Sequence, residues 1–492
     1  MRRIIHHLYL QNRNYVLGAI LISILLLTGF KLIYPYPNMV LDSYYYVLAA
    51  ISHADVNAWA IGYSWFLRAF GIFSHSPLLL VIFQYLFLET SLLVFFLTIQ
   101  QFFPLSKLSK KILFVFFFVN PLFLYCANFI MADALFVSLS VFWISLLLWM
   151  VFRPRPYLLV VHALLLLLVF TVRYNALYYP VVATIALAIS RYTSWQKALG
   201  VALQLILIGA FITYTAIRVG DISGKTQFSP FGNWKTANDA LYMYGHIYQD
   251  DNDTPPPNFA LLHKMVKYYF KSGSKVDDLL DYQRPFYGSI YMFYNGSPLV
   301  VYKNYLYGRD TQFVNFNKMA YLGPLYGQYG SWLIRQHPWA FVRYFMMPNA
   351  RRYMVPPMEA FSGLQTFFLR TDYLRQAAKT WFGMTTLAAS EDAIHFRDAL
   401  LFPYQMLIAC IHLLFLINLI GYGIMRGFRS LSRHERYTLL LLTALWLCDL
   451  GFNLTAAASV MRYEIFLLII EFSVTVGLIE RIYFQKMAIP TA

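Results

Sequence analysis

The sequence predicts a mainly α fold: a polytopic membrane helix bundle with about ten transmembrane helices, interfacial helices and a sizeable outer domain. Of the 492 residues, 59% are hydrophobic and only 13% are charged. A soluble domain is closer to half apolar and a quarter charged. In addition, long apolar stretches recur along the chain, and only two extended hydrophilic segments interrupt them. These observations together exclude an ordinary soluble globular protein.

A helix needs roughly 20 mostly apolar residues to cross a bilayer. The first candidate has no small-residue cleavage site, so we interpret it as a retained helix rather than a signal peptide. Several central candidates are short and closely spaced, which predicts tight hairpins. The candidates cover residues 15–34, 77–99, 112–127, 133–152, 157–172, 174–190, 198–217, 401–425, 437–454 and 460–480.

The hydrophilic segments divide the chain. We expect an N-terminal transmembrane module at 1–217 with a catalytic first outer loop at 35–76, an outer domain at 218–400, and C-terminal transmembrane helices at 401–492. With the N-terminus inside, the predicted cytoplasmic segments carry 16 of the 39 Lys and Arg residues, and the short outer segments carry only 4. The other 19 lie in the long outer segment, which is exempt from the positive-inside rule. The charge distribution therefore supports this topology.

The net charge of +16 does not indicate a nucleic-acid partner, because Lys and Arg are spread along the chain without a recognition motif. The three cysteines, Cys126, Cys410 and Cys448, fall in or beside apolar segments. They indicate neither a disulfide framework nor a zinc site. We find no internal repeat, glycine-rich phosphate loop or metal-spaced His/Cys cluster in the sequence.

The first outer loop contains two stretches that are typical of helices lying at the membrane surface. The stretch DSYYYVLAA begins at Asp42, and WAIGYSWFLRAFG is aromatic on most sides. Trp and Tyr favour the interface, so Tyr45 and Tyr63 are candidates to line a pocket there. A later stretch, WLIRQHPWAFVRYFMMPNARRYMVPP, is amphipathic and basic and also suits the membrane surface.

Two carboxylates are the leading candidates for chemistry. Asp42 and Asp133 each begin an apolar helical stretch on the predicted outer face. Either could be a helix N-cap. Two carboxylates on one face could instead act as a general base and its partner, or share a divalent metal ion. No cofactor is certain from the sequence, and a divalent metal is left open.

Basic residues on the same face suggest a site for phosphate. Arg173 and Arg462 lie at outer helix ends, where they could snorkel to water or clamp a lipid phosphate through the planar guanidinium. Arg352 lies on the basic surface stretch. Lipid headgroups are its default partner, and the alternative is direct contact with a phosphate-bearing donor substrate. His53 and Asp55, in the first loop, could meet an acceptor or a metal, although a solvated loop is the simpler interpretation.

At these residues the chain resembles the GT-C class of membrane glycosyltransferases, especially the group of dolichyl-phosphate-mannose-protein mannosyltransferases and aminoarabinose transferases. The resemblance rests on six stretches in order, which cover the first 190 residues well and the remainder in patches. They are LDSYYYVLAA, NAWAIGYSWFLRAFG, NPLFLYCANFIMADALFVSLSVFW, LLVFTVRYNALYYPVV, RQHPWAFVRYF and MRYEIFL. Many relatives have Asp-Glu in the first loop, whereas here Ser43 follows Asp42.

The resemblance implies transfer of a sugar, with inversion, from a polyprenyl-phosphate carrier to an acceptor hydroxyl on the outer face. Asp42 would be the base. Asp133 would orient the acceptor or help to hold an ion. Arg462, with Arg173, would stabilise the leaving phosphate. The partners would be the lipid-linked donor, membrane lipids and a glycan, lipid or protein acceptor, in what we expect to be a bacterial inner membrane with the catalytic face towards the periplasm.

Other functions remain open at this level. A polymerase or ligase that uses a diphosphate-linked oligosaccharide would also place arginines in its outer loops. A transporter or flippase would favour inverted repeats and broken helices at the middle of the bilayer, which the sequence does not suggest. A non-catalytic assembly subunit would tolerate Asp42→Asn.

Overall fold

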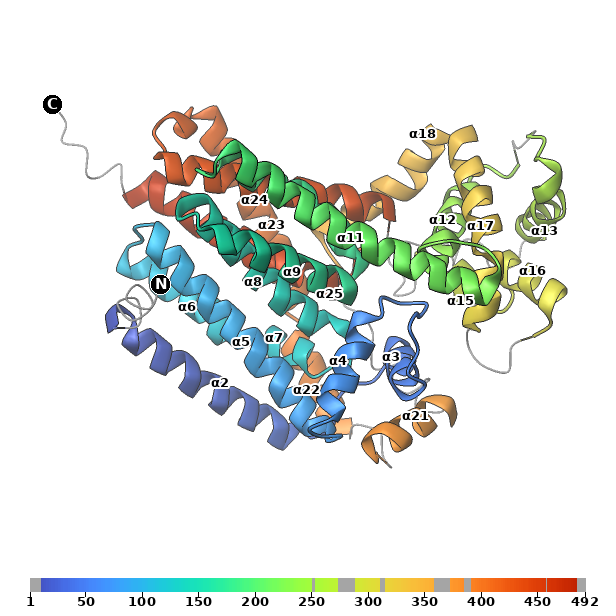
Figure 1. Ribbon diagram of the computed structural model, residues 1–492, viewed down its shortest axis with the longest axis horizontal. Coiled ribbons are helices and arrows are strands. Elements are labelled where there is room, and N and C mark those ends of the chain that lie inside the picture. Colours follow the sequence, from blue (N-terminus) through green and yellow to red (C-terminus); the bar gives the residue numbers. More distant parts are fainter. Residues whose placement is uncertain are drawn as a thin grey trace.

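The computed structural model describes residues 10–249, 253–272, 288–309, 315–357, 372–384, 391–456 and 458–484. Within these ranges the chain is helical and has no strand; the one β-bridge joins Asn38 to Phe129. Long helices form an elongated bundle, and a group of shorter helices lies at one end of it (Figure 1). The predicted mainly helical class is confirmed.

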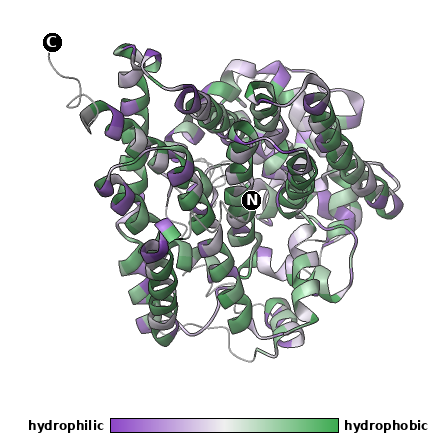
Figure 2. Ribbon diagram, turned by 60° about the vertical axis from the view of Figure 1, so that its left-hand side comes forward, coloured by the Kyte–Doolittle hydropathy of each residue, from purple (hydrophilic) through white to green (hydrophobic). Residues whose placement is uncertain are grey.

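Seven helices in the described part of the chain are long and apolar enough to cross a membrane. Apolar residues dominate these long helices (Figure 2). The seven are α2 (Arg13–Ile33), α5 (Pro77–Phe102), α6 with α7 (Lys107–Ala127), α8 (Ala132–Phe152), α11 (Ser194–Ser223), α22 with α23 (Glu391–Ile424) and α24 (Arg433–Ala456). The protein therefore belongs to the membrane class.

Three further predicted spans are helices that are either shorter or more polar than these seven. They are α9 (Pro156–Val172), η1 with α10 (Tyr174–Ile189) and α25 (Met461–Ile479). The first two are short, and α25 carries several charged residues. Every apolar stretch singled out in the sequence is thus a helix or a pair of helices.

Proline and polar caps set the breaks between spans. The stretch predicted as one helix at 112–127 is two, α6 (Lys107–Phe118) and α7 (Pro121–Ala127). Pro121 is the first residue of α7, where its missing N–H costs nothing, and the Asn120 side chain accepts a hydrogen bond from the Leu122 N–H at 3.1 Å. The span is therefore divided at residues 119 and 120.

Helix α8 lies at the centre of the bundle, and 72% of an apolar 18-residue stretch of it is buried. It packs against α5, α9, α10 and α25. Trp143 of α8 is fully buried and stacks on Tyr179 of α10, with ring centroids 4.1 Å apart. By contrast, α2, α11 and α23 expose large apolar side chains such as Leu25, Ile206 and Ile417. These are the faces that suit lipid.

The described helices between Pro230 and Met354 form a second helical group. Helices α12 (Pro230–Tyr244) and α17 (Phe316–Gln336) pack closely, because Gly330 on α17 lies against the backbone of α12. The shorter elements around them are η2 (Pro257–Phe259), α13 (Ala260–Lys271), α15 (Ile290–Phe293), α16 (Pro298–Tyr307), α18 (Pro338–Phe341), η3 (Val342–Met346) and α19 (Met347–Met354).

Helix α11 joins the two groups (Figure 1). Its 30 residues span about 45 Å at 1.5 Å each, which exceeds the roughly 30 Å of a bilayer core. The helix continues past residue 217 to Ser223 and ends at Gly224, whose φ of 65° suits glycine. At the other boundary, α22 (Glu391–Leu401) begins ahead of residue 401.

Two short helices follow α2, as the first-loop pattern predicts. They are α3 (Leu41–Ile51) and α4 (Gly62–Gly71). Helix α3 packs against α21 (Asp372–Phe382), and α4 packs against α9. At the second contact Gly62 has no room for a side chain, since a Cβ there would lie 2.5 Å from the carbonyl carbon of Thr171.

Gly62→Ala is therefore expected to lower the free energy of unfolding by about 1–3 kcal/mol, the usual cost of overpacking. Thr171 lies two residues before Arg173, so the same change should also displace that arginine. Thermal unfolding in detergent measures the effect. Gly209→Ala on α11 is the matched control, because a Cβ there meets nothing within 4 Å. Equal melting temperatures for the two variants would contradict the prediction.

Candidate functional site

Four charged side chains from four separate elements meet at the end of the bundle that carries α3 and α4. Asp42 is the second residue of α3, Asp133 is the second residue of α8, Arg173 directly follows α9, and Arg462 is the second residue of α25. We call these four residues the charge cluster. The helices end at similar depth, so side chains distant in sequence come together.

Arg462 lies between the two carboxylates. Its Nη1 is 3.1 Å from Oδ2 of Asp42 and 3.5 Å from Oδ2 of Asp133. Nη1 of Arg173 donates to Oδ1 of Asp133. The Asp133 and Arg173 side chains are only 6% and 15% exposed, whereas Asp42 and Arg462 are 23% and 20% exposed. The cluster thus has a buried pair and a more accessible pair joined by one guanidinium.

Tyr463 supports both arginines, although the sequence did not single it out. Its ring centroid lies 4.5 Å from the guanidinium carbon of Arg173 and 5.0 Å from that of Arg462. An aromatic face attracts a cation at these distances. Tyr463 directly follows Arg462 in the MRYEIFL stretch, and this adjacency was the available signal.

The interpretation of the two aspartates as N-caps is wrong. Val40 and Met131 occupy the N-cap positions of α3 and α8, and neither makes a side-chain capping hydrogen bond. Asp42 and Asp133 each lie two positions after the N-cap, within the first turn. Their negative charge still favours the positive end of the helix dipole, but their oxygens face the two arginines instead of backbone N–H groups.

A small cavity of about 30 Å³ opens beside the cluster. Asp133 and Arg462 line it together with residues of α7, α25 and the turn between α7 and α8. This volume holds about two water molecules. The site therefore combines an apolar wall with one carboxylate and one guanidinium, and a larger ligand must reach it from the membrane or the surface.

The tyrosines behind α3 and α4 are buried. Burial, reinforced by the charge of Asp42, raises the pKa of Tyr46 above its usual value. Burial also raises the pKa of Tyr63, whose hydroxyl donates to Oε1 of Gln84 at 2.7 Å. Tyr45 is 4% exposed and stacks on Trp59. Tyr45 and Tyr63, named as pocket candidates, do not line the cavity; they hold α3 and α4 in place.

Other candidates have identified partners outside the four residues of the cluster. Asp55 pairs with Arg218 of α11, with Nε of the arginine 3.1 Å from Oδ2. His53 is exposed and has a φ of 51° at the turn after α3. Arg352 is buried on α19, where its Nε donates to the Ser459 carbonyl at 3.2 Å. These contacts give Asp55 and Arg352 structural partners.

The two cluster carboxylates do not fit a divalent metal well, because each faces a guanidinium that already balances its charge. Among the described residues, no group of three or more His, Cys, Asp or Glu side chains is arranged to hold a metal ion. We therefore derive no step through a metal.

Two carboxylates inside the bundle, Glu89 and Asp449, accept hydrogen bonds, as expected for acidic groups in the membrane. Glu89 accepts from the Ser23 hydroxyl at 3.1 Å. Asp449 accepts from Tyr178 at 2.7 Å and from Asn453 at 2.9 Å. The Ser23 contact joins α2 to α5, and the Tyr178 contact joins η1 to α24, which the sequence could not predict. Comparison with protein-family models, curated proteins and solved structures found no match for this chain.

Proposed function

We propose that the protein is an integral membrane glycosyltransferase that moves a sugar from a polyprenyl phosphate to an acceptor hydroxyl, with inversion. In this proposal ten helices cross the membrane, and the charge cluster and the 218–400 segment lie on the outer, periplasmic face. The GT-C resemblance and the positive-inside charge distribution support this orientation.

One observation carries the proposal: Arg462 contacts Asp42 and Asp133 at once, beside an apolar-walled cavity. A guanidinium next to apolar surface suits the phosphate end of a lipid carrier. The carboxylate of Asp42, the more exposed acid, suits a general base for a hydroxyl that arrives from the water side.

The proposed step is a single displacement. The acceptor oxygen attacks the anomeric carbon, the bond from that carbon to the phosphate oxygen breaks, and the hydroxyl proton goes to Asp42. The phosphate gains one negative charge while Asp42 loses its own. Arg462 then loses its attraction to Asp42 just as the leaving phosphate becomes the stronger anion, so the guanidinium can follow the charge.

Asp133 and Arg173 are positioning residues in this mechanism. Their buried ion pair holds Asp133 beside Nη1 of Arg462. Tyr463 packs over both guanidinium groups. The pair thus keeps the phosphate-binding arginine aligned without itself touching the sugar.

The binding of fluorescent polyprenyl phosphate to purified protein tests the donor site without knowledge of the sugar. Arg462→Ala is expected to weaken binding roughly ten-fold to hundred-fold, the loss of one charge-assisted hydrogen-bonded contact. Arg462→Lys should lie between, because it keeps the charge but not the planar fork. Arg68→Ala is the control; Arg68 lies on α4 and donates to the Ala54 carbonyl instead.

The same preparation distinguishes the alternatives. Radiolabelled hexose on polyprenyl phosphate, incubated with membrane extract as acceptor, should yield free polyprenyl phosphate and labelled product. Exclusive use of diphosphate-linked oligosaccharide would instead indicate a polymerase or ligase. Movement of intact donor across vesicles, without bond cleavage, would indicate a flippase. Equal carrier binding by Arg462→Ala and wild type would remove the basis of the proposal.

A further inference from the structure

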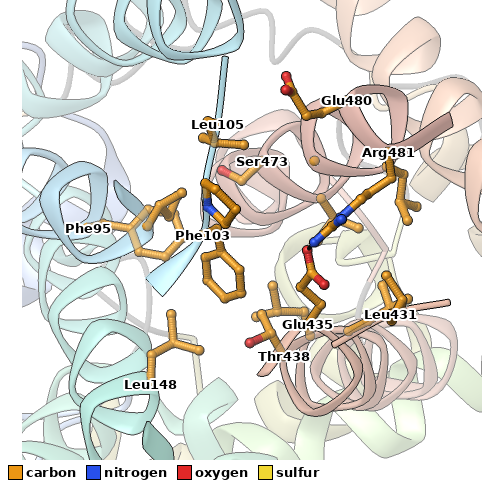
Figure 3. A pocket seen from close by; sticks show the side chains of 17 residues that line it. Phe95, Phe103, Leu105, Leu148, Leu431, Glu435, Thr438, Ser473, Glu480 and Arg481 are labelled. Carbon is orange, nitrogen blue, oxygen red and sulfur yellow. Dashed lines mark ion pairs between the residues drawn. The ribbon is translucent and has the colours of Figure 1, made fainter. Parts of the chain in front are cut away.

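A second, larger cavity of about 110 Å³ lies at the opposite end of the bundle from the charge cluster. It opens between α5, α8, α24 and α25, next to the 103–105 turn. In Figure 3, Phe95, Phe103 and Leu148 lie on one side of it, while Glu435 and Arg481 point toward one another on the other. The cavity therefore has an apolar wall and a charged mouth.

The acidic groups at this mouth already have partners. Glu435 forms an ion pair with Arg481. Glu480 accepts hydrogen bonds from the Ser106 N–H at 3.1 Å and the Ser106 hydroxyl at 2.8 Å, at the start of α6. In addition, the Thr438 hydroxyl lines the cavity and has no hydrogen-bond partner among the described residues.

Exposed basic residues lie on the same chain segments that form this mouth. Lys107 directly follows Ser106, and Arg433 and Arg436 flank Glu435. All three are exposed. Each basic residue near an anionic membrane surface contributes about 1 kcal/mol of attraction, and basic pockets between transmembrane helices suit anionic lipid headgroups. The charge around the rim therefore favours a negatively charged lipid.

We infer that this cavity binds one anionic phospholipid, with a segment of its acyl chain between α5, α8, α24 and α25 and its phosphate at the basic rim. The cavity is somewhat smaller than the roughly 150 Å³ cavities that accept benzene, so it takes several methylene groups and not a whole chain. If the basic end faces the cytoplasm, the lipid comes from the inner leaflet.

The two parts of the lipid contribute differently. An acyl chain in a bilayer is already in apolar surroundings, so entering the cavity yields only packing contacts along walls that would otherwise face a void. Selection among lipids therefore comes from the headgroup.

Gly477 offers a clean test, because it lines the cavity and a Cβ on it would meet nothing within 4 Å. Gly477→Leu should fill the space without a backbone clash. Gly421→Leu is the matched control: Gly421 is also a helical glycine with open space, but it does not line the cavity. Phosphatidylglycerol and phosphatidylcholine are titrated separately into purified full-length protein, and bound lipid is counted by native mass spectrometry.

Wild type and Gly421→Leu should retain one phosphatidylglycerol more tightly than phosphatidylcholine, and Gly477→Leu should lose that molecule. Arg433→Gln and Arg436→Gln should each weaken phosphatidylglycerol binding about five-fold, with the cavity intact. Unchanged retention by Gly477→Leu would overturn the site. Equal retention of the two lipids by wild type would overturn the charge selection, and with it the anionic lipid.

Discussion

Asp42→Asn is expected to lower the rate of sugar transfer roughly 10²-fold to 10⁴-fold, the usual contribution of a positioned general base. Asparagine has the same shape but cannot accept the proton of the acceptor hydroxyl. Because the Asp42 side chain is 23% exposed, we expect the fold to survive the change. Turnover of labelled donor under saturating conditions measures the effect, and the binding of polyprenyl phosphate should change far less.

Asp55→Asn is the matched control for this variant. Asp55 lies on the same first loop and also pairs with an arginine, Arg218, which is not part of the charge cluster. It should keep wild-type turnover. If Asp42→Asn also turns over donor at the wild-type rate, Asp42 is not the base, and a non-catalytic role for the protein becomes the better hypothesis.

Arg173→Met should have the largest effect on stability. The Asp133 side chain is 6% exposed, and Arg173 is its closest partner in the cluster. Removing one member of a buried ion pair costs about 3–5 kcal/mol where the other charge is left uncompensated. Arg462 still lies 3.5 Å from Asp133, so we expect a cost at the lower end of this range. We expect a lower melting temperature in detergent together with a loss of transfer, since Asp133 would no longer be held beside Arg462.

The double variant Arg173→Met with Asp133→Asn separates the two effects. Neutralising both partners removes the buried charge, so much of the stability should return. Transfer should remain low, because the alignment of Arg462 is still lost. A double variant no more stable than Arg173→Met alone would show that Arg173 acts mainly through its contacts with Phe136 and Tyr463.

Much of the fold follows from local pattern. The apolar stretches around 77–99 and 133–152 correspond to α5 and α8, because a run of that length in lipid can satisfy its backbone only as a helix. Positions of breaks were harder to predict. The run at 112–127 is interrupted at Asn120. A proline in such a run can either bend one helix or start another, and here Pro121 starts α7.

The candidate site divides in the same way. Asp42, Asp133, Arg173 and Arg462 attract notice because charge is rare in such a chain. Their pairing is not a local property: Arg462 and Asp42 are separated by 420 positions in the sequence. Tyr45 and Tyr63 show the converse, because an interfacial aromatic pattern cannot distinguish a pocket wall from a buried support.

By itself, the sequence determined that this is a helical membrane protein and which few charged residues merit attention. A helix in lipid must consist mostly of apolar residues, so each charged residue in it stands out. Only the tertiary structure decided that two acids share one guanidinium, that Tyr463 packs over both arginines, and that Arg352 and Asp55 pair with Ser459 and Arg218. Those contacts depend on where helix ends meet in space, which is set by the packing of the whole bundle.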